Sequence, residues 1–235
     1  MPSTGKRQHP DLLLDGSNNR VVFTQDTQSN GANQQIVVHF PDTGASSLTL
    51  EANGVNGITA VNYPQVDDST NGIWHLVFYE DYTSGGTSGS KIRHAYCTAS
   101  TGCDAIGEWK FEDVATTTSA NLLLRNPYVT TDGNRVFIVY MEDTNSTTTQ
   151  TYKADYESTC GTASAGWSWA AASSTPRSAT SGWSQSLFMG RKPVAANRVD
   201  NVFYWDYAEV SSYPTSPSMS DGDLWWSRTT YTDCP

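Results

Sequence analysis

The sequence predicts an all-β protein built from four antiparallel repeats, each a meander of four strands. Short runs rich in Val, Ile, Phe, Tyr and Trp recur along the chain, separated by clusters of Gly, Asn, Asp, Ser and Thr, which is the pattern of short strands. No stretch of a dozen residues places apolar side chains at helical spacing,. A proline and an aspartate return together at intervals of roughly 55–65 residues, which indicates an internal repeat.

The first half of each repeat reads as two strands joined by a turn. A proline begins a short apolar strand, a turn follows, and a second strand rich in aromatic residues ends at an aspartate. Asp15-Gly16-Ser17-Asn18 and Asp132-Gly133-Asn134 are typical tight-turn sequences between two such strands,. The marker residues are Pro10, Pro64, Pro127 and Pro193, with Asp26, Asp81, Asp143 and Asp206.

The second half of each repeat supplies the outer strands. Third strands are predicted at residues 35–40, 91–96, 151–155 and 223–228, and fourth strands at residues 47–52, 108–114 and 166–172. The repeats then span approximately 7–55, 56–118, 119–184 and 185–235. The fourth repeat has no fourth strand within this sequence.

A single four-stranded sheet cannot bury both of its faces, and stacking the sheets radially solves that problem. The sequence therefore predicts four blades of a β-propeller, which could belong to a larger ring. Three arrangements remain open: a segment of a longer propeller, two copies that combine as a homodimer, or a four-bladed ring closed by the N-terminal segment. We favour a partial or paired ring, because residues 1–9 contain no apparent strand that replaces the missing one.

Composition excludes several classes of partner. The chain carries 14 Lys and Arg against 24 Asp and Glu, a net charge of −10, so nucleic acid and anionic membrane surfaces are unexpected partners. No apolar run is long enough to insert in a membrane. The N-terminus has no signal-peptide core, but the polar composition with few lysines is similar to that of mature secreted bacterial proteins. We expect an extracellular or cell-surface location.

The second and third repeats carry a family resemblance. Val77-Phe78-Tyr79-Glu80-Asp81 is followed by Ala95, Cys103 and Trp109, and Val139-Tyr140-Met141-Glu142-Asp143 is followed by Ala154, Cys160 and Trp167. This order resembles the blades of secreted bacterial β-propellers of the sialidase-like (neuraminidase-repeat) superfamily, over nearly the whole chain. The Asp box of sialidases is absent. The nearest match, at residues 220–225, precedes a third strand, so the resemblance implies architecture rather than sialidase activity.

Charged residues predict a candidate ligand site. In a meander, the start of the first strand and the end of the second lie at the same end of the blade, so Arg and Asp side chains should gather there. They would bind a carboxylate or sulfate, or pair with one another and set the register of the blades, and we favour the pairing. Arg-x-x-Pro, which the resemblance links to binding of a substrate carboxylate, is matched in spacing by Arg7 alone. The candidates are Arg7, Arg125, Arg191, Asp26, Asp81, Asp143 and Asp206, with Trp205 from an aromatic cluster that either contacts sugar or packs between blades.

The predicted function is a module that binds a glycan or a protein on this end of the blades. A sialidase-like glycoside hydrolase or lyase is the alternative, and a structural or assembly domain is a second one. Catalysis is not the favoured interpretation, because Glu80-Asp81 and Glu142-Asp143 are adjacent on strands and so point to opposite faces. A pair of acids from two blades could still act together.

Metal sites and disulfides complete the sequence-based expectations. No cofactor is expected. Calcium is conceivable in the acidic loops at residues 26–30 and 143–145, and the four histidines lack zinc-ligand spacing,. Cys97 and Cys103 flank a short hairpin turn and are predicted to form a disulfide. The pairing of Cys160 and Cys234 stays open.

Overall fold

A computed structural model describes most of the chain. The described residues are 6–27, 33–69, 71–132, 135–143, 150–158, 160–171, 178–179, 183–188, 202–210 and 222–230. Side chains are described at residues 7–27, 33–69, 71–131, 135–142 and 160–169.

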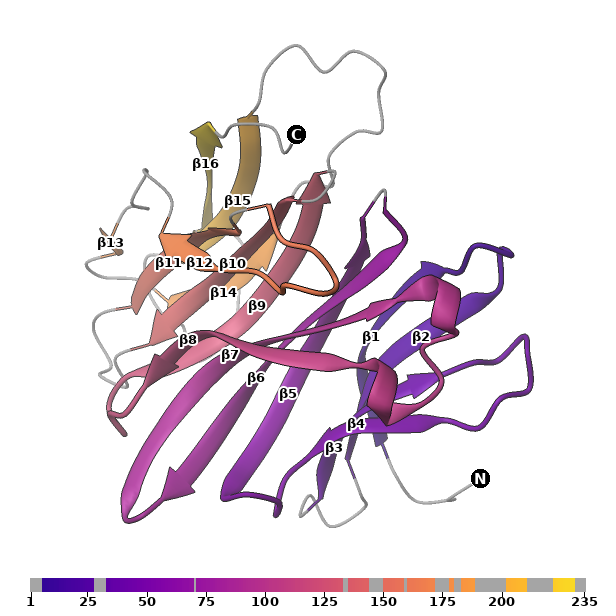
Figure 1. The fold of residues 1–235 in the computed structure, drawn as a ribbon. Helices are drawn as coiled ribbons and strands as arrows, with labels where there is room; N and C mark the ends of the chain where they lie inside the picture. Colours follow the sequence, from indigo (N-terminus) through magenta and orange to yellow (C-terminus); the bar gives the residue numbers. More distant parts are fainter. Residues whose placement is uncertain are drawn as a thin grey trace.

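The described chain is an array of antiparallel meanders, which we number as blades 1 to 4 in chain order (Figure 1). Two short 3₁₀ helices, η1 (Ala99–Thr101) and η2 (Ile106–Glu108), lie between β7 and β8. Blade 1 contains β1 (Lys6–Leu14), β2 (Arg20–Thr27), β3 (Gln34–His39) and β4 (Leu48–Ala52), and blade 2 contains β5 (Ile58–Asp68), β6 (Ile73–Ser84), β7 (Thr87–Thr98) and β8 (Lys110–Thr117). Blade 3 contains β9 (Leu123–Asp132), β10 (Arg135–Asp143), β11 (Gln150–Ser158) and β12 (Trp169–Ala171), with β13 (Ser178–Ala179) also paired to β11, and blade 4 contains β14 (Trp183–Phe188), β15 (Val202–Val210) and β16 (Gly222–Thr230).

These strands agree with the predicted meanders in blades 1 to 3. In blade 4 the strand paired with β15 is β14, which straddles the predicted boundary between the third and fourth repeats. Pro193, the predicted start of the first strand of that repeat, lies outside the described residues. The number of blades in a complete ring stays a prediction.

A β-bulge interrupts the first strand of each of the first three blades. His9, Tyr63 and Asn126 each precede a marker proline and have positive φ angles of 48°, 57° and 46°. The pairing of first and second strands shifts at these positions. Because a bulge tolerates a proline that has no N–H to donate, the strand continues through the proline. Arg7 and Arg125 therefore lie within β1 and β9, not before the first strands as the sequence predicted.

The four marker aspartates are not equivalent in register. Asp81 pairs with Ala60, four residues before Pro64, and Asp143 pairs with Leu123, four residues before Pro127. Asp26 instead pairs with Arg7, three residues before Pro10. A shift of one residue turns a side chain to the other side of its sheet, so Asp26 occupies the position of Glu80 in blade 2 rather than that of Asp81.

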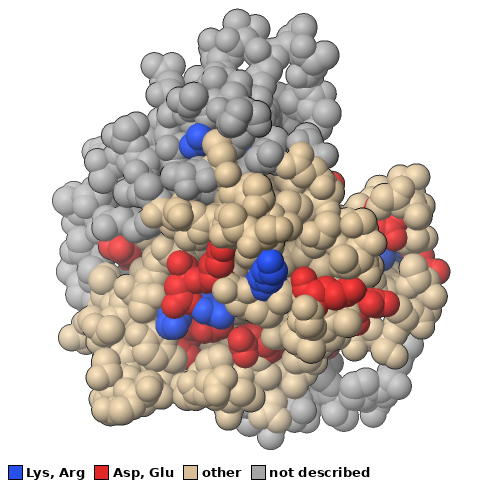
Figure 2. Space-filling view, viewed as in Figure 1, with Lys and Arg blue, Asp and Glu red and all other residues tan. Residues whose placement is uncertain are grey.

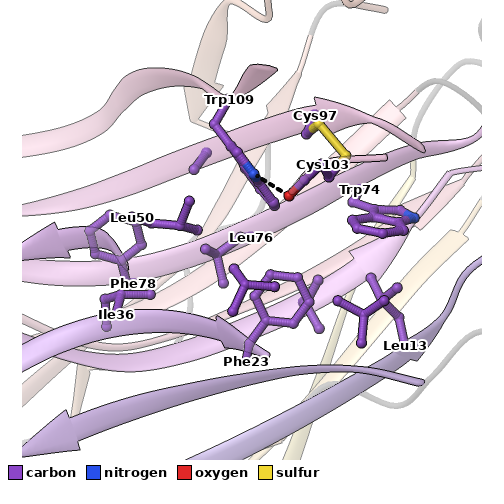
Figure 3. Close-up of a cluster of buried hydrophobic side chains, with 14 of the residues drawn as sticks. Leu13, Phe23, Ile36, Leu50, Trp74, Leu76, Phe78, Cys97, Cys103 and Trp109 are labelled. Carbon is purple, nitrogen blue, oxygen red and sulfur yellow. Dashed lines mark hydrogen bonds between the residues drawn. A yellow bond between two sulfur atoms is a disulfide. The ribbon is translucent and has the colours of Figure 1, made fainter. Parts of the chain in front are cut away.

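Blades 1 and 2 share a hydrophobic core (Figure 3). Phe23 and Ile36 of blade 1 and Leu76 and Phe78 of blade 2 are fully buried in it. The predicted disulfide closes one edge of this core: Cys97 and Cys103 are bonded, with their Cα atoms 5.9 Å apart, and the Trp109 indole N–H donates to the Cys103 carbonyl at 3.1 Å. Cys160 is also disulfide-bonded, and Cys234 lies outside the described residues.

We expect the Cys97→Ala/Cys103→Ala variant to lose about 2 kcal/mol of unfolding free energy, as estimated from the closure entropy of so short a loop. Urea denaturation followed by circular dichroism measures the loss. The variant is compared under oxidising conditions, since reduction would also break the bond at Cys160. Unchanged stability would show that the bond adds nothing to the packing around Trp109.

A buried polar row crosses the interface between blades 2 and 3. His75 and His94 are fully buried, and their Nδ1 and Nε2 atoms lie 2.9 Å apart. His94 Nδ1 lies 3.2 Å from a Glu112 carboxylate oxygen, whose partner oxygen accepts the Trp167 backbone N–H of blade 3 at 2.9 Å. With His94 donating to Glu112, its Nε2 accepts from His75 Nδ1, so two neutral histidines can form the row, and the buried His75 Nε2 has no partner among the described residues.

A buried carboxylate lies between blades 1 and 2. Glu80 is 4% exposed, and Arg93 Nε lies 3.2 Å from its carboxylate. Burial raises the pKa of Glu80 to about 7, more than the Arg93 charge lowers it. Arg93 also pairs with Asp113, which binds Lys91 Nζ at 2.8 Å. Figure 2 shows acidic and basic side chains gathered together on this side of the molecule.

Candidate functional site

The bulges bring aromatic rings together near the middle of the first strands. We call the end where these strands begin, around Arg7, Ile58 and Leu123, the entry end of the blades; the opposite end lies around Leu14 and Asp68. His9 and Tyr63, the left-handed residues of the first two bulges, are half-buried. Their ring centroids lie 3.8 Å apart, so the two rings meet between blades 1 and 2. Tyr63 in turn stacks on Tyr79 of β6 at 5.8 Å. The result is a row of three rings near the middle of the blades.

An ion pair between blades 2 and 3 extends this row. Arg125 donates to both carboxylate oxygens of Asp81, at 2.7 and 2.9 Å, and its guanidinium lies 4.4 Å from the centroid of the Tyr79 ring. Burial raises the pKa of Tyr79 to about 12, so its hydroxyl stays neutral. Cation–π contact and the bidentate pair together fix the guanidinium plane beside the aromatic row.

Tyr128 and Asp11 come from the first strands of blades 3 and 1. Burial raises the pKa of Tyr128, and the nearby Asp11 and Tyr63 raise it further, so the three first strands converge at this place. Asp11 also accepts the Val66 backbone N–H at 2.8 Å, which ties β1 to β5. The row therefore consists of the half-buried rings of His9 and Tyr63 and the buried ring of Tyr79, with fixed polar groups beside them.

Arg7 and Asp26 belong to a separate network on blade 1. Arg7 Nε lies 3.7 Å from Asp26, and the Thr24 hydroxyl donates to Asp26 at 2.5 Å. His39 Nε2 lies 2.8 Å from that hydroxyl, and His39 Nδ1 lies 2.8 Å from the Ser47 hydroxyl. Burial lowers the pKa of His39. Asp26 alternates with Gln25 along β2, so it lies on the other side of the sheet from the blade 1–2 core.

The candidate arginines thus do not form one pocket among the described residues. Arg125 pairs with Asp81, and Arg7 lies near Asp26 on the side of blade 1 that faces away from blade 2. The backbones of Asp143, Asp206 and Trp205 lie in β10 and β15, but their side chains are not described, and Arg191 lies outside the described residues.

Sequence reasoning missed the aromatic row. His9 and Tyr63 immediately precede the marker prolines, and this shared position was the available signal. Within a strand, however, each reads as an ordinary alternating residue, and the ring-to-ring contact depends on the bulge.

No metal site or membrane span is found in the described parts. No group of three or more His, Cys, Asp or Glu side chains is arranged there to hold an ion, and no helix described is long and apolar enough to cross a bilayer. The two loops proposed for calcium, at residues 26–30 and 143–145, fall largely outside the described residues.

Comparison with solved structures supports the propeller fold. A GH93 α-L-arabinofuranosidase of Fusarium graminearum with arabinobiose superposes with a TM-score of 0.57 at 13% identity, covering 98% of this chain and 65% of that one. A Fusarium graminearum α-L-arabinofuranosidase in complex with an iminosugar inhibitor gives 0.54 at 14% identity, covering 96% and 63%. The likeness shows that the chain has a β-propeller fold. The chain spans less than two thirds of these structures, and no family model and no curated protein matches it.

Proposed function

We propose that this protein is a carbohydrate-binding β-propeller module whose ligand site is the aromatic row near the middle of blades 1 to 3. The observation that carries the proposal is the stack of His9, Tyr63 and Tyr79 beside the fixed guanidinium of Arg125. A sugar ring offers C–H groups that pack on aromatic faces and hydroxyls that bind planar charged groups. The disulfide and the acidic composition fit an extracellular setting,.

Tyr63→Ala is expected to weaken binding of arabinobiose, the disaccharide held by the similar arabinofuranosidase, by at least about tenfold, since it removes the central ring of the stack. Tyr63 is half-buried, so the variant should fold. Isothermal titration calorimetry against arabinobiose and a panel of other oligosaccharides measures the loss. Phe111→Ala on the outer strand β8 is the control and should bind as the unchanged protein does. Equal affinity of both variants for every bound sugar would contradict the proposal.

A glycoside hydrolase is the second candidate, favoured by the α-L-arabinofuranosidase activity of the similar structures. Asp81 forms an ion pair with Arg125, and Asp11 accepts a hydrogen bond from the Val66 backbone N–H. Neither is therefore a free acid for a two-carboxylate mechanism. Release of nitrophenol from p-nitrophenyl α-L-arabinofuranoside would support this candidate. Binding of sugar without turnover would support the binding module instead.

A further inference from the structure

A pocket lies between blades 1 and 2 at the end of the blades around Leu14 and Asp68. Its volume is about 370 Å³, within the range of small-molecule sites. Asp15 comes from the β1–β2 turn and Trp74 from the start of β6. Gly102 lies within the loop closed by the disulfide, and Asp104 directly follows Cys103. Phe40 and Thr43 line it from the segment that follows β3.

The pocket has aromatic walls held in the core. Trp74 is 3% exposed and Phe40 is 6% exposed. Figure 3 shows Trp74 beside the Cys97–Cys103 bond, so the surrounding wall is covalently braced. Trp74 lines the pocket as an almost fully buried residue. An indole N–H can only donate a hydrogen bond, so a ligand hydroxyl would be its acceptor here.

The charge of the pocket is negative. Hydrogen bonds from the Asn19 side chain and backbone lower the pKa of Asp15, so this carboxylate stays ionised at acidic pH. Asp104 supplies a second carboxylate, and the lining includes no Lys or Arg. The nearby Arg20 is already paired with Asp42. Two carboxylates next to two aromatic rings favour a cationic group, through charge-assisted hydrogen bonds and cation–π attraction.

We propose that this pocket binds a small hydroxylated amine, such as an amino sugar. The ammonium group lies against Asp104 and Asp15, and a ligand hydroxyl accepts the Trp74 indole N–H. The site is distinct from the aromatic row, because the two share no residue.

The test is an NMR titration of the indole N–H resonance of Trp74 with D-glucosamine at about pH 6, where the amine is charged. Trp74→Phe assigns the resonance. We expect a saturable shift, with affinity about tenfold weaker for D-glucose and N-acetyl-D-glucosamine, which lack the charge. Asp104→Asn should weaken glucosamine binding by about tenfold. The matched control, Asp42→Asn, removes a nearby acid that does not line the pocket and should change affinity by less than about twofold.

Three results would overturn the proposal: no saturable shift up to about 10 mM glucosamine, equal affinity for D-glucose, or unchanged affinity in Asp104→Asn. Arabinobiose binding, measured on the same samples, tests the aromatic row separately. Loss of one response with retention of the other therefore tells which site assignment has failed.

Discussion

Replacing Glu80 by Gln is expected to raise the free energy of unfolding by about 3 kcal/mol above pH 7. Burial raises the pKa of Glu80 from 4.5 to about 7, and a tenfold difference in proton affinity between the folded and unfolded states corresponds to about 1.4 kcal/mol. Since the folded state holds the proton more tightly than the unfolded chain, the ionised carboxylate destabilises the fold above pH 7. Below pH 4.5 both states are protonated and this penalty is absent.

Urea denaturation of Glu80→Gln and the unchanged protein at about pH 8 and about pH 4.5 measures this difference. The stability gain should be present at the higher pH and lost at the lower one. Asp113→Asn is the control from the same charged group, and it should reduce stability because Lys91 and Arg93 lose their shared acceptor. A destabilised Glu80→Gln at the higher pH would mean that the pairing with Arg93 outweighs the burial of the charge.

Acid is expected to weaken the interface between blades 2 and 3 through His75 and His94. Burial lowers the pKa of both, and the neighbouring His94 lowers that of His75 further. The unfolded chain, with histidine pKa values near 6.5, therefore binds more protons than the folded one. This contribution to stability is complete above about pH 6.5 and is lost as pH falls towards the folded-state values, by up to about 1.4 kcal/mol per pH unit for each histidine.

Hydrogen exchange of the Trp167 backbone amide follows this interface directly, because that amide donates to Glu112. The His75→Phe/His94→Gln variant keeps a ring beside Trp167 and a donor for Glu112, and it should lose the pH dependence of protection between about pH 7 and about pH 5. Amides of β2 in blade 1 serve as the internal comparison. The same pH dependence in the variant would locate the acid sensitivity elsewhere.

Much of the architecture follows from local pattern. Apolar runs, turn sequences and the two periodic markers predict the meanders of blades 1 to 3, and the Cys97–Cys103 spacing predicts the bond that closes the turn after β7. The recurrence of Arg with Asp also suggested that these residues pair, and Arg125 with Asp81 does so between blades.

Local sequence pattern did not predict the bulges, nor which side of its sheet Asp26 faces. A residue before proline favours extended backbone, so nothing local indicates the left-handed conformation of His9, Tyr63 and Asn126; the surrounding sheet imposes it. Asp26 and Asp81 hold similar places in the repeated sequence, but their pairing with the first strand differs by one residue. That difference reverses the side of the sheet that the side chain faces.

The order of strands within the first three blades bears on how the protein is made. β1 pairs with β2, β2 with β3, and β3 with β4, and the same sequence of pairings recurs in blades 2 and 3. Each new strand leaving the ribosome finds its partner in the strand made just before it, so pairing proceeds with short loop closures. The core between blades 1 and 2 needs Leu76 and Phe78 of β6. The nascent first blade therefore exposes Phe23 and Ile36 until the second blade is half synthesised, and during that interval it depends on shielding from aggregation.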